Sequence, residues 1–186
     1  MLLAVYTAGN VSLWGEGKRG GIQKFISKEG DIYVVTQQAR SNSVQVIVLL
    51  AHGFKEGSAI YCLVRLREAG INASLVGISA GLISGSHGIS VRPDSTLGQV
   101  MDVPPPKIVL FPDGKKSVLA LLADPRVHRL LAATIKNNGI IAAMPVAASM
   151  LDSLELKLET AVSPLITQSH GTLDEFANRL INLVIS

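Results

Sequence analysis

The chain has 186 residues, a formal net charge of +3 and one cysteine; 48% of its residues are hydrophobic, but only 4% are aromatic. This length fits one domain, or one domain with a short appendage, and allows a single hydrophobic core. The lone cysteine, Cys62, excludes an intrachain disulfide and a Cys/His zinc framework, and it favours a reducing compartment.

Charge and hydropathy exclude further classes of partner. The basic residues Lys18-Arg19 and Lys115-Lys116 form only pairs, whereas nucleic-acid-binding proteins carry basic stripes, so we expect no nucleic-acid partner. The apolar residues 1–6 lack a basic segment and are too short for a signal peptide. No later run reaches the roughly 18 apolar residues of a membrane span. We therefore expect a cytoplasmic protein with no membrane partner.

From residue 44 onward, strand and helix patterns alternate, which is typical of an α/β fold. We predict strands at 44–50, 73–78, 107–111, 140–144 and 165–167, and an alternating, strand-like segment at 154–158. We predict helices at 55–69, 116–122, 125–137 and 172–183, a short helix or sharp turn at 145–151, and a hairpin or irregular excursion at 82–91. The apolar strands indicate a mostly parallel sheet with helices on both faces.

Several local features refine these elements. The helix at 55–69 is expected to place Ile60, Leu63 and Val64 on its covered side, with Leu66 as a further candidate. Asp124 is expected to cap the helix that begins at Pro125. Residues 93–96 have the composition of a turn.

Residues 1–43 do not join this alternation. They contain two short strand-like segments, 3–7 and 32–36, separated by a glycine-rich stretch. Within that stretch, residues 15–20 match GxGxxG, but they neither follow a strong strand nor open a clear helix, so a flexible loop fits better than a dinucleotide site. We predict an N-terminal extension or hairpin at 1–43, an α/β domain at 44–186, and no cofactor or metal.

Polar side chains near the predicted strand ends are candidates for a site, because open α/β sheets bind ligands there. His52 and Glu56 are either a general base with its orienting carboxylate, or an ordinary surface pair at a helix start. Ser58 and Ser149 are nucleophiles by type, but neither lies in a Gly-x-Ser-x-Gly elbow, so helix serines are the simpler interpretation.

Two further residues allow alternative interpretations. Cys62 is either a redox thiol or a small buried hydrophobe, and its apolar spacing within a helix favours the second. His170 precedes the last helix, and it is either a cleft residue that pairs with Asp113 or His52, or a plain turn histidine.

Five stretches in chain order resemble motifs of the ThiJ/PfpI family, a class I glutamine amidotransferase-like group. VLLAHGFKE (48–56) resembles its Leu-Ala-x-Gly-x-x-Glu strand end, FPDG (111–114) its Leu-Pro-Gly-Gly turn, and GIIAAMP (139–145) its strand into the nucleophile elbow. RPDSTL (92–97) and GTLDEFA (171–177) resemble two further signatures. The resemblance covers residues 44–186 and implies a flavodoxin-like three-layer sandwich.

The chain departs from the family at the expected site. The resemblance places the family's nucleophilic cysteine at Pro145, which has neither a nucleophilic atom nor an N–H. It places the partnering glutamate at Ser58, and one glycine of the turn becomes Asp113, beside Gly114. A carboxylate there would oppose a developing oxyanion. The segment between the elbow and the last strand, which in the family contains the active-site histidine, is also shorter.

These departures favour a protein without the family's glyoxalase or deglycase chemistry, acting as a binding, chaperone-like or assembly module. The alternative is an enzyme that uses a non-cysteine pocket on small carbonyl compounds, such as aldehydes or glycated substrates. Its candidate residues are His52, Glu56, Ser58, Asp113, Gly114 and His170. The resemblance also implies a homodimer and a role in oxidative stress.

Overall fold

The computed structural model describes residues 44–153, 165–168 and 171–186. The strands are β1 (Val46–Leu50), β2 (Ala73–Gly77), β3 (Ile83–Ser84), β4 (Ser90–Val91), β5 (Ser95–Thr96), β6 (Ile108–Phe111), β7 (Ile140–Ala143) and β8 (Leu165–Thr167). The helices are α1 (Glu56–Glu68), α2 (Leu97–Met101), α3 (Lys115–Leu122), α4 (Pro125–Lys136), α5 (Pro145–Ser153) and α6 (Leu173–Ile185). The predicted strands and helices that fall on described residues are confirmed, with small shifts at their ends.

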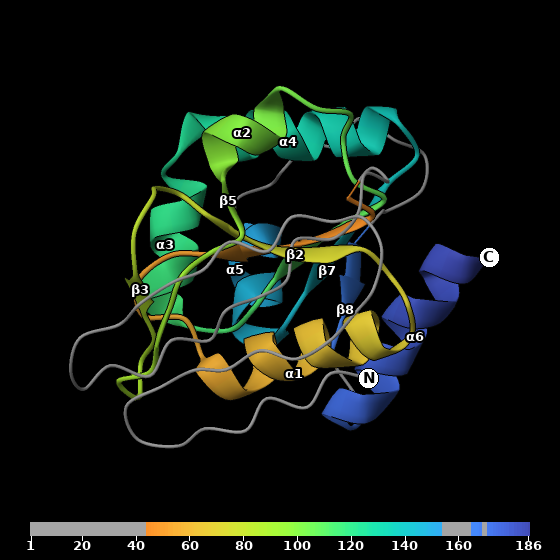
Figure 1. The fold of residues 1–186 in the computed structure, drawn as a ribbon, viewed down its shortest axis with the longest axis horizontal. Helices are drawn as coiled ribbons and strands as arrows, with labels where there is room; N and C mark the ends of the chain where they lie inside the picture. Colours follow the sequence, from red (N-terminus) through yellow and green to blue (C-terminus); the bar gives the residue numbers. More distant parts are fainter. Residues whose placement is uncertain (1–43, 154–164, 169–170) are drawn as a thin grey trace, which may run out of the picture. The chain divides into compact units, whose positions relative to one another are not determined.

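Six of the strands form one parallel sheet in the order β5-β2-β1-β6-β7-β8, and β3 and β4 pair as a separate antiparallel hairpin. The run β2-β1-β6-β7-β8 has the strand order of flavodoxin-like folds, with β5 added at one edge. Because the strands are parallel, their carboxyl ends lie at the same edge of the sheet (Figure 1). The predicted α/β fold with a mostly parallel sheet is thus confirmed.

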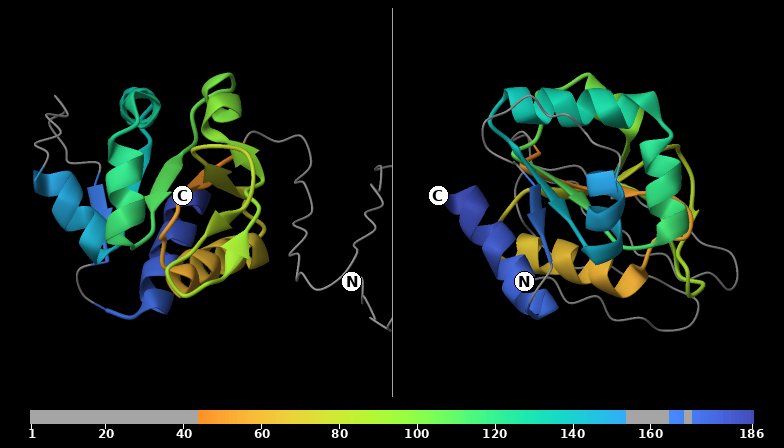
Figure 2. Two further views of the ribbon diagram at one scale, coloured as in Figure 1. Left: turned by 90° about the vertical axis from the view of Figure 1, so that its left-hand side faces the viewer. Right: turned by 180° about the vertical axis from the view of Figure 1, so that it is seen from behind.

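Helices cover both faces of this sheet (Figure 2). One face packs against α1 and α6 and includes the β1 side chains of Val46, Val48 and Leu50. The opposite face packs against α2, α3, α4 and α5, around Ile47 and Leu49. All five β1 side chains are buried, and for this reason the strand is continuously apolar rather than alternating.

Side-chain caps determine where α4 and α6 begin. The Arg126 N–H donates to the carboxylate of Asp124 at 2.9 Å, and Pro125 occupies the first helical position, as predicted. Thr172 and Glu175 form a capping box at the start of α6, in which each side chain accepts a hydrogen bond from the other residue's N–H. These local bonds explain why both helix starts could be predicted from the sequence.

Two local predictions were wrong. Val64 is 45% exposed rather than covered, because α1 turns Ala59 and Cys62 toward the sheet instead. The predicted turn at 93–96 contains β5 and leads directly into α2, whose first turn is capped by the Thr96 side chain. Pairing with β2 draws this short segment into the sheet, a tertiary effect that its turn-like composition does not reveal.

Three expectations concern residues outside the described part of the chain: those for residues 1–43, for the segment at 154–158 and for His170. They stay predictions. Within the described ranges, no helix combines the length and apolar character needed to cross a membrane.

Candidate functional site

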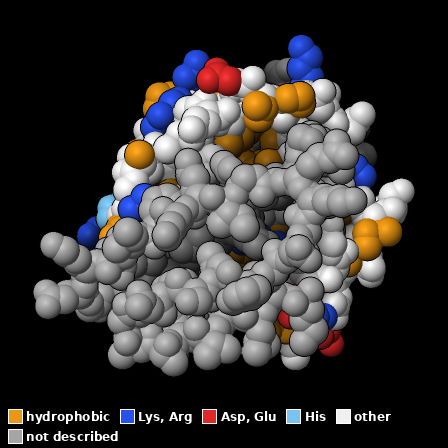
Figure 3. Space-filling view, viewed as in Figure 1, with side chains coloured by type: hydrophobic (Ala, Val, Ile, Leu, Met, Phe, Trp, Pro, Cys, Tyr) orange, Lys and Arg blue, Asp and Glu red, His pale blue; other side chains and the backbone are white. Residues whose placement is uncertain are grey.

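The carboxyl edge of the sheet brings several of the predicted site residues together. The strand order reverses direction between β1 and β6, because β2 lies on the outer side of β1 and β7 on the outer side of β6. Open α/β sheets bind their ligands at such a switch point, beyond the carboxyl ends of the strands. His52 and Gly53 follow β1, and Asp113 and Gly114 follow β6. Figure 3 shows a His side chain and Lys or Arg side chains along the left of the face that it draws.

The segments after β1 and β6 are in direct backbone contact. Gly53 and Gly114 have φ values of +86° and +125°, which favour glycine. A Cβ added to Gly114 would overlap the Gly53 carbonyl oxygen and lie 2.9 Å from the Cα of Phe54. The Lys55 N–H also donates to the Asp113 carbonyl oxygen at 2.8 Å. Glycine at position 114 is therefore required by the close approach of the two turns.

The expected elbow lies between β7 and α5. Pro145 is exposed and is the first residue of α5, immediately after Met144. The next backbone N–H, that of Val146, donates to Asp113 Oδ1 at 2.9 Å. A carboxylate of the chain itself thus lies at the electropositive start of α5. In an acyl-transfer enzyme, such N–H groups would instead be available to a substrate oxyanion.

The two serines considered as nucleophiles make local hydrogen bonds. Ser58 Oγ donates to the Lys55 carbonyl oxygen at 3.3 Å, and Ser149 Oγ donates to the Pro145 carbonyl oxygen at 3.1 Å. Bonds of this kind, three or four residues back along the helix, are common for helical serines. Among the described residues, no histidine is hydrogen-bonded to either hydroxyl, so neither serine has an activating base there.

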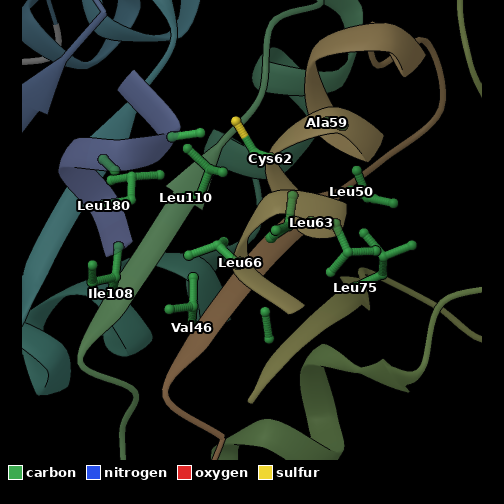
Figure 4. Close-up of a cluster of buried hydrophobic side chains, with 14 of the residues drawn as sticks. Val46, Leu50, Ala59, Cys62, Leu63, Leu66, Leu75, Ile108, Leu110 and Leu180 are labelled. Carbon is green, nitrogen blue, oxygen red and sulfur yellow. The ribbon is translucent and has the colours of Figure 1, made fainter. Parts of the chain in front are cut away.

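Cys62 lies inside the core between α1 and the sheet, near Leu110 and Leu180 (Figure 4). Its exposed fraction is 0%. Burial raises the pKa of the Cys62 thiol to about 12, because the apolar surroundings disfavour the thiolate. The thiolate is the reactive form of cysteine, so the environment of Cys62 is that of an inert core residue.

His52 and Glu56 do not pair with each other, since each has a different partner on the hairpin formed by β3 and β4. The exposed His52 accepts a hydrogen bond at Nδ1 from the Ser84 N–H, at 3.1 Å. Glu56 is bound by His87 instead. The acid–base interpretation of His52 therefore lacks its expected orienting carboxylate.

Glu56 is 3% exposed, although it is the first residue of α1. Its Oε2 lies 2.8 Å from His87 Nδ1, and its Oε1 accepts hydrogen bonds from the N–H groups of His87 at 2.6 Å and Ile89 at 3.4 Å. Ser86 Oγ donates to Oε2 at 3.3 Å. A Cβ added to Gly85 would overlap the Glu56 side chain, so glycine leaves room for the carboxylate.

Two opposing effects act on the Glu56 carboxyl group. Burial raises its pKa, but the hydrogen bonds from the His87 side chain and from backbone N–H groups outweigh burial and lower the pKa to about 2. Glu56 is therefore ionised at neutral pH. The His87 side chain is 73% exposed, so this pair joins a buried carboxylate to an accessible imidazole.

His87 is the residue that sequence reasoning missed. It lies in the hairpin turn of Gly85-Ser-His-Gly88, a composition that indicates a surface turn. One signal in the sequence could have pointed to His87. The hairpin of β3 and β4 begins just after β2, whose carboxyl end lies at the edge of the sheet that carries the candidate site. Its contact with Glu56 depends on how the hairpin folds back over the start of α1, which periodicity does not encode.

The described residues contain no group of three or more His, Cys, Asp or Glu side chains placed to hold a metal ion. These residues offer two chemical arrangements. The Asp113 carboxylate accepts a hydrogen bond from the Val146 N–H at the start of α5, and it therefore occupies the place where the helix start would otherwise attract an anion. The Glu56 carboxylate orients the His87 imidazole, as the carboxylate of an acid–base site orients its histidine.

Residues 44–162 match the DJ-1/PfpI family, and the chain belongs to this family. The match includes the turn at Asp113 and Gly114 and the start of α5 at Pro145. No curated protein matches the chain.

Solved structures of the DJ-1 superfamily share the fold. Drosophila melanogaster DJ-1beta is 25% identical, with a TM-score of 0.66 over 77% of this chain and 91% of that chain. A cysteine-to-alanine mutant of a DJ-1 superfamily protein from Salmonella typhimurium is 23% identical, with a TM-score of 0.64 over 76% and 90%. Oxidized Toxoplasma gondii DJ-1 is 21% identical, with a TM-score of 0.66 over 76% and 91%.

Proposed function

We propose that this DJ-1/PfpI-family protein does not use a cysteine nucleophile and acts as a binding, chaperone-like or assembly module. The observation that carries the proposal is the elbow, where Pro145 begins α5 and the Asp113 carboxylate accepts the Val146 N–H at 2.9 Å.

The chemistry of covalent catalysis supports this interpretation. A nucleophile must attack the carbonyl carbon, and hydrogen-bond donors must stabilise the oxyanion that forms. Pro145 supplies neither a nucleophile nor a donor. The neighbouring Asp113 carboxylate would repel the developing negative charge. The buried Cys62, with its thiol pKa of about 12, is a poor substitute.

A second function is favoured by one observation, the pair of Glu56 and His87. A buried carboxylate that orients an exposed imidazole is one half of a general acid–base arrangement. This alternative function is a cysteine-independent enzyme that acts on small aldehydes. The expected homodimer and cytoplasmic location belong to the proposal in either case.

Methylglyoxal consumption by the full chain distinguishes the two functions, with boiled protein as the background. The binding-module proposal expects no consumption above that background. Consumption that survives in Cys62→Ala but falls at least tenfold in His87→Asn would support the acid–base enzyme. Loss of activity in Cys62→Ala would contradict both functions.

The assembly part of the proposal has its own measurement. Light scattering after size-exclusion chromatography determines the mass of the full chain in solution, and a homodimer is expected at twice the 19.7 kDa of the monomer. A monomer at micromolar concentration would remove the homodimer from the proposal and leave the elbow argument unchanged.

A further inference from the structure

The β3–β4 hairpin is attached to the segment after β1 by hydrogen bonds that resemble strand pairing. The Gly53 N–H donates to the Ser84 carbonyl oxygen at 2.8 Å, and the Ser86 N–H donates to the Phe54 carbonyl oxygen at 2.9 Å. Between these two bonds, the Ser84 N–H donates to His52 Nδ1 at 3.1 Å. The His52 imidazole thus takes the place that a backbone carbonyl would have in a regular ladder.

This bond depends on the protonation state of His52. Nδ1 accepts a hydrogen only while it is unprotonated, so the neutral ring carries its proton on Nε2. Protonation of the ring would place an N–H of His52 against the N–H of Ser84, and the bond would be lost. Histidine is the side chain whose charge ordinarily changes between pH 5 and 8.

The tip of the same hairpin is attached differently. The Glu56 carboxylate accepts hydrogen bonds from the N–H groups of His87 and Ile89, and its other oxygen contacts His87 Nδ1. A protonated His87 still donates from Nδ1, so acid preserves this attachment. The Glu56 carboxylate has a pKa of about 2 and stays ionised through the range in which histidines titrate.

Among the described residues, the elements packed against the segment after β1 carry several charged and titratable side chains. They are Lys55 and Glu56 at the start of α1, Asp113 after β6, Lys116 on α3, and His87 on the hairpin. Lysine and carboxylate side chains ordinarily keep their charge between about pH 5.5 and about pH 8. Of these residue types, histidine is the one whose charge ordinarily changes in that range.

We propose that His52 is a pH-sensitive latch, whose protonation releases the Ser84 side of the β3–β4 hairpin while Glu56 keeps the tip at residues 86–89 attached. Ile83, the buried residue next to the latch, becomes more accessible when the latch opens. Leu82 and Ile89, on the same hairpin, are already 47% and 56% exposed. Acid would thus loosen one wall of the candidate site and enlarge an apolar surface beside it.

Amide hydrogen exchange of Ser84, measured by NMR on the full chain and corrected for the intrinsic pH dependence of exchange, tests this latch. We expect exchange to rise about two- to tenfold between about pH 8 and about pH 5.5, the range that the loss of one hydrogen bond produces. In His52→Asn, whose side-chain oxygen can accept near the Nδ1 position without titrating, exchange should be independent of pH.

Two controls make the result specific. His87→Asn removes the other histidine of the hairpin, and the Ser84 transition should persist in it. The imidazole nitrogen signals of His52 provide a second readout, with Nδ1 unprotonated and Nε2 protonated at about pH 8. A pH-independent Ser84 amide in the wild type, an equal rise in His52→Asn, or the opposite tautomer would overturn the proposal.

Discussion

Asp113 Oδ1 accepts a hydrogen bond from the Val146 N–H at 2.9 Å, which joins the turn after β6 to the first turn of α5. The first N–H groups of a helix have no partner within the helix. Pro145 has no N–H to satisfy, and Asp113 satisfies the next one from a different part of the chain. The same contact that completes the helix start places a fixed negative charge at the expected elbow.

Asp113→Ala is expected to lower the free energy of unfolding by about 1 kcal/mol, because α5 loses its capping carboxylate. Urea denaturation at neutral pH measures the loss. Asp113→Asn keeps an acceptor and should lose less.

Asp102→Ala is the matched control, since Asp102 is an exposed aspartate at the end of α2. We expect its free energy of unfolding to change by less than about 0.5 kcal/mol. Equal losses in the Asp113 and Asp102 variants would argue against the capping role.

Glu56→Gln is expected to lower the free energy of unfolding by about 2 kcal/mol at neutral pH, since several hydrogen bonds to a buried charge are weakened. The pKa of Glu56 is lowered from its ordinary 4.5 to about 2. The ionised carboxylate therefore stabilises the fold above about pH 4.5, and this contribution is lost as the pH falls toward 2.

Urea denaturation of wild type and Glu56→Gln at several pH values tests this sign. The difference between them should shrink steadily below about pH 4.5. Glu68→Gln, on the same helix but exposed, should show little difference at any pH. A Glu56 effect that is constant down to about pH 3 would refute the assigned cause.

Gly114→Ala is expected to destabilise the protein by about 2 kcal/mol or more, because a side chain is strained at φ +125° and its Cβ overlaps the Gly53 carbonyl oxygen. Thermal unfolding followed by circular dichroism measures the loss. Gly57→Ala, in α1 with no heavy atom within 4 Å of the added Cβ, should be neutral or stabilising. A tolerated Gly114→Ala would mean that the two turns are not held together as described.

Cys62 is expected to react with a thiol reagent only when the protein opens. With 0% exposure and a thiol pKa of about 12, the native thiol is both inaccessible and uncharged at pH 8. Absorbance after addition of an aromatic disulfide reagent should rise slowly in buffer and at once in urea. Fast native labelling would instead identify Cys62 as a reactive thiol.

Much of the fold could be predicted because the signals are local. The apolar runs of β1, β6 and β7 mark buried parallel strands, and the Asp124-Pro125 pair marks the start of α4. The segment around β5 could not be predicted in this way, because two residues pair with β2 through tertiary contact.

The candidate site could be predicted only in part, for the same reason. Pro145 and Asp113 were found because they replace motif residues at fixed spacing. The partners of Glu56 and His52 were not found, because both lie on the β3–β4 hairpin, about thirty residues further along the chain. The path of that hairpin is set by packing, since its residues Ile83 and Val91 are buried in the core. Packing of this kind produces no hydrophobic periodicity in the sequence.

The most direct test of the central claim is methylglyoxal consumption by the full wild-type chain and by Cys62→Ala, each against boiled protein. A protein without a nucleophile at its elbow should show no consumption above the boiled background in either form. Catalytic consumption by the wild type that is lost in a Cys62→Ala variant shown to be folded by circular dichroism would contradict the account, because it would require a reactive cysteine, and Cys62 is the only one in the chain.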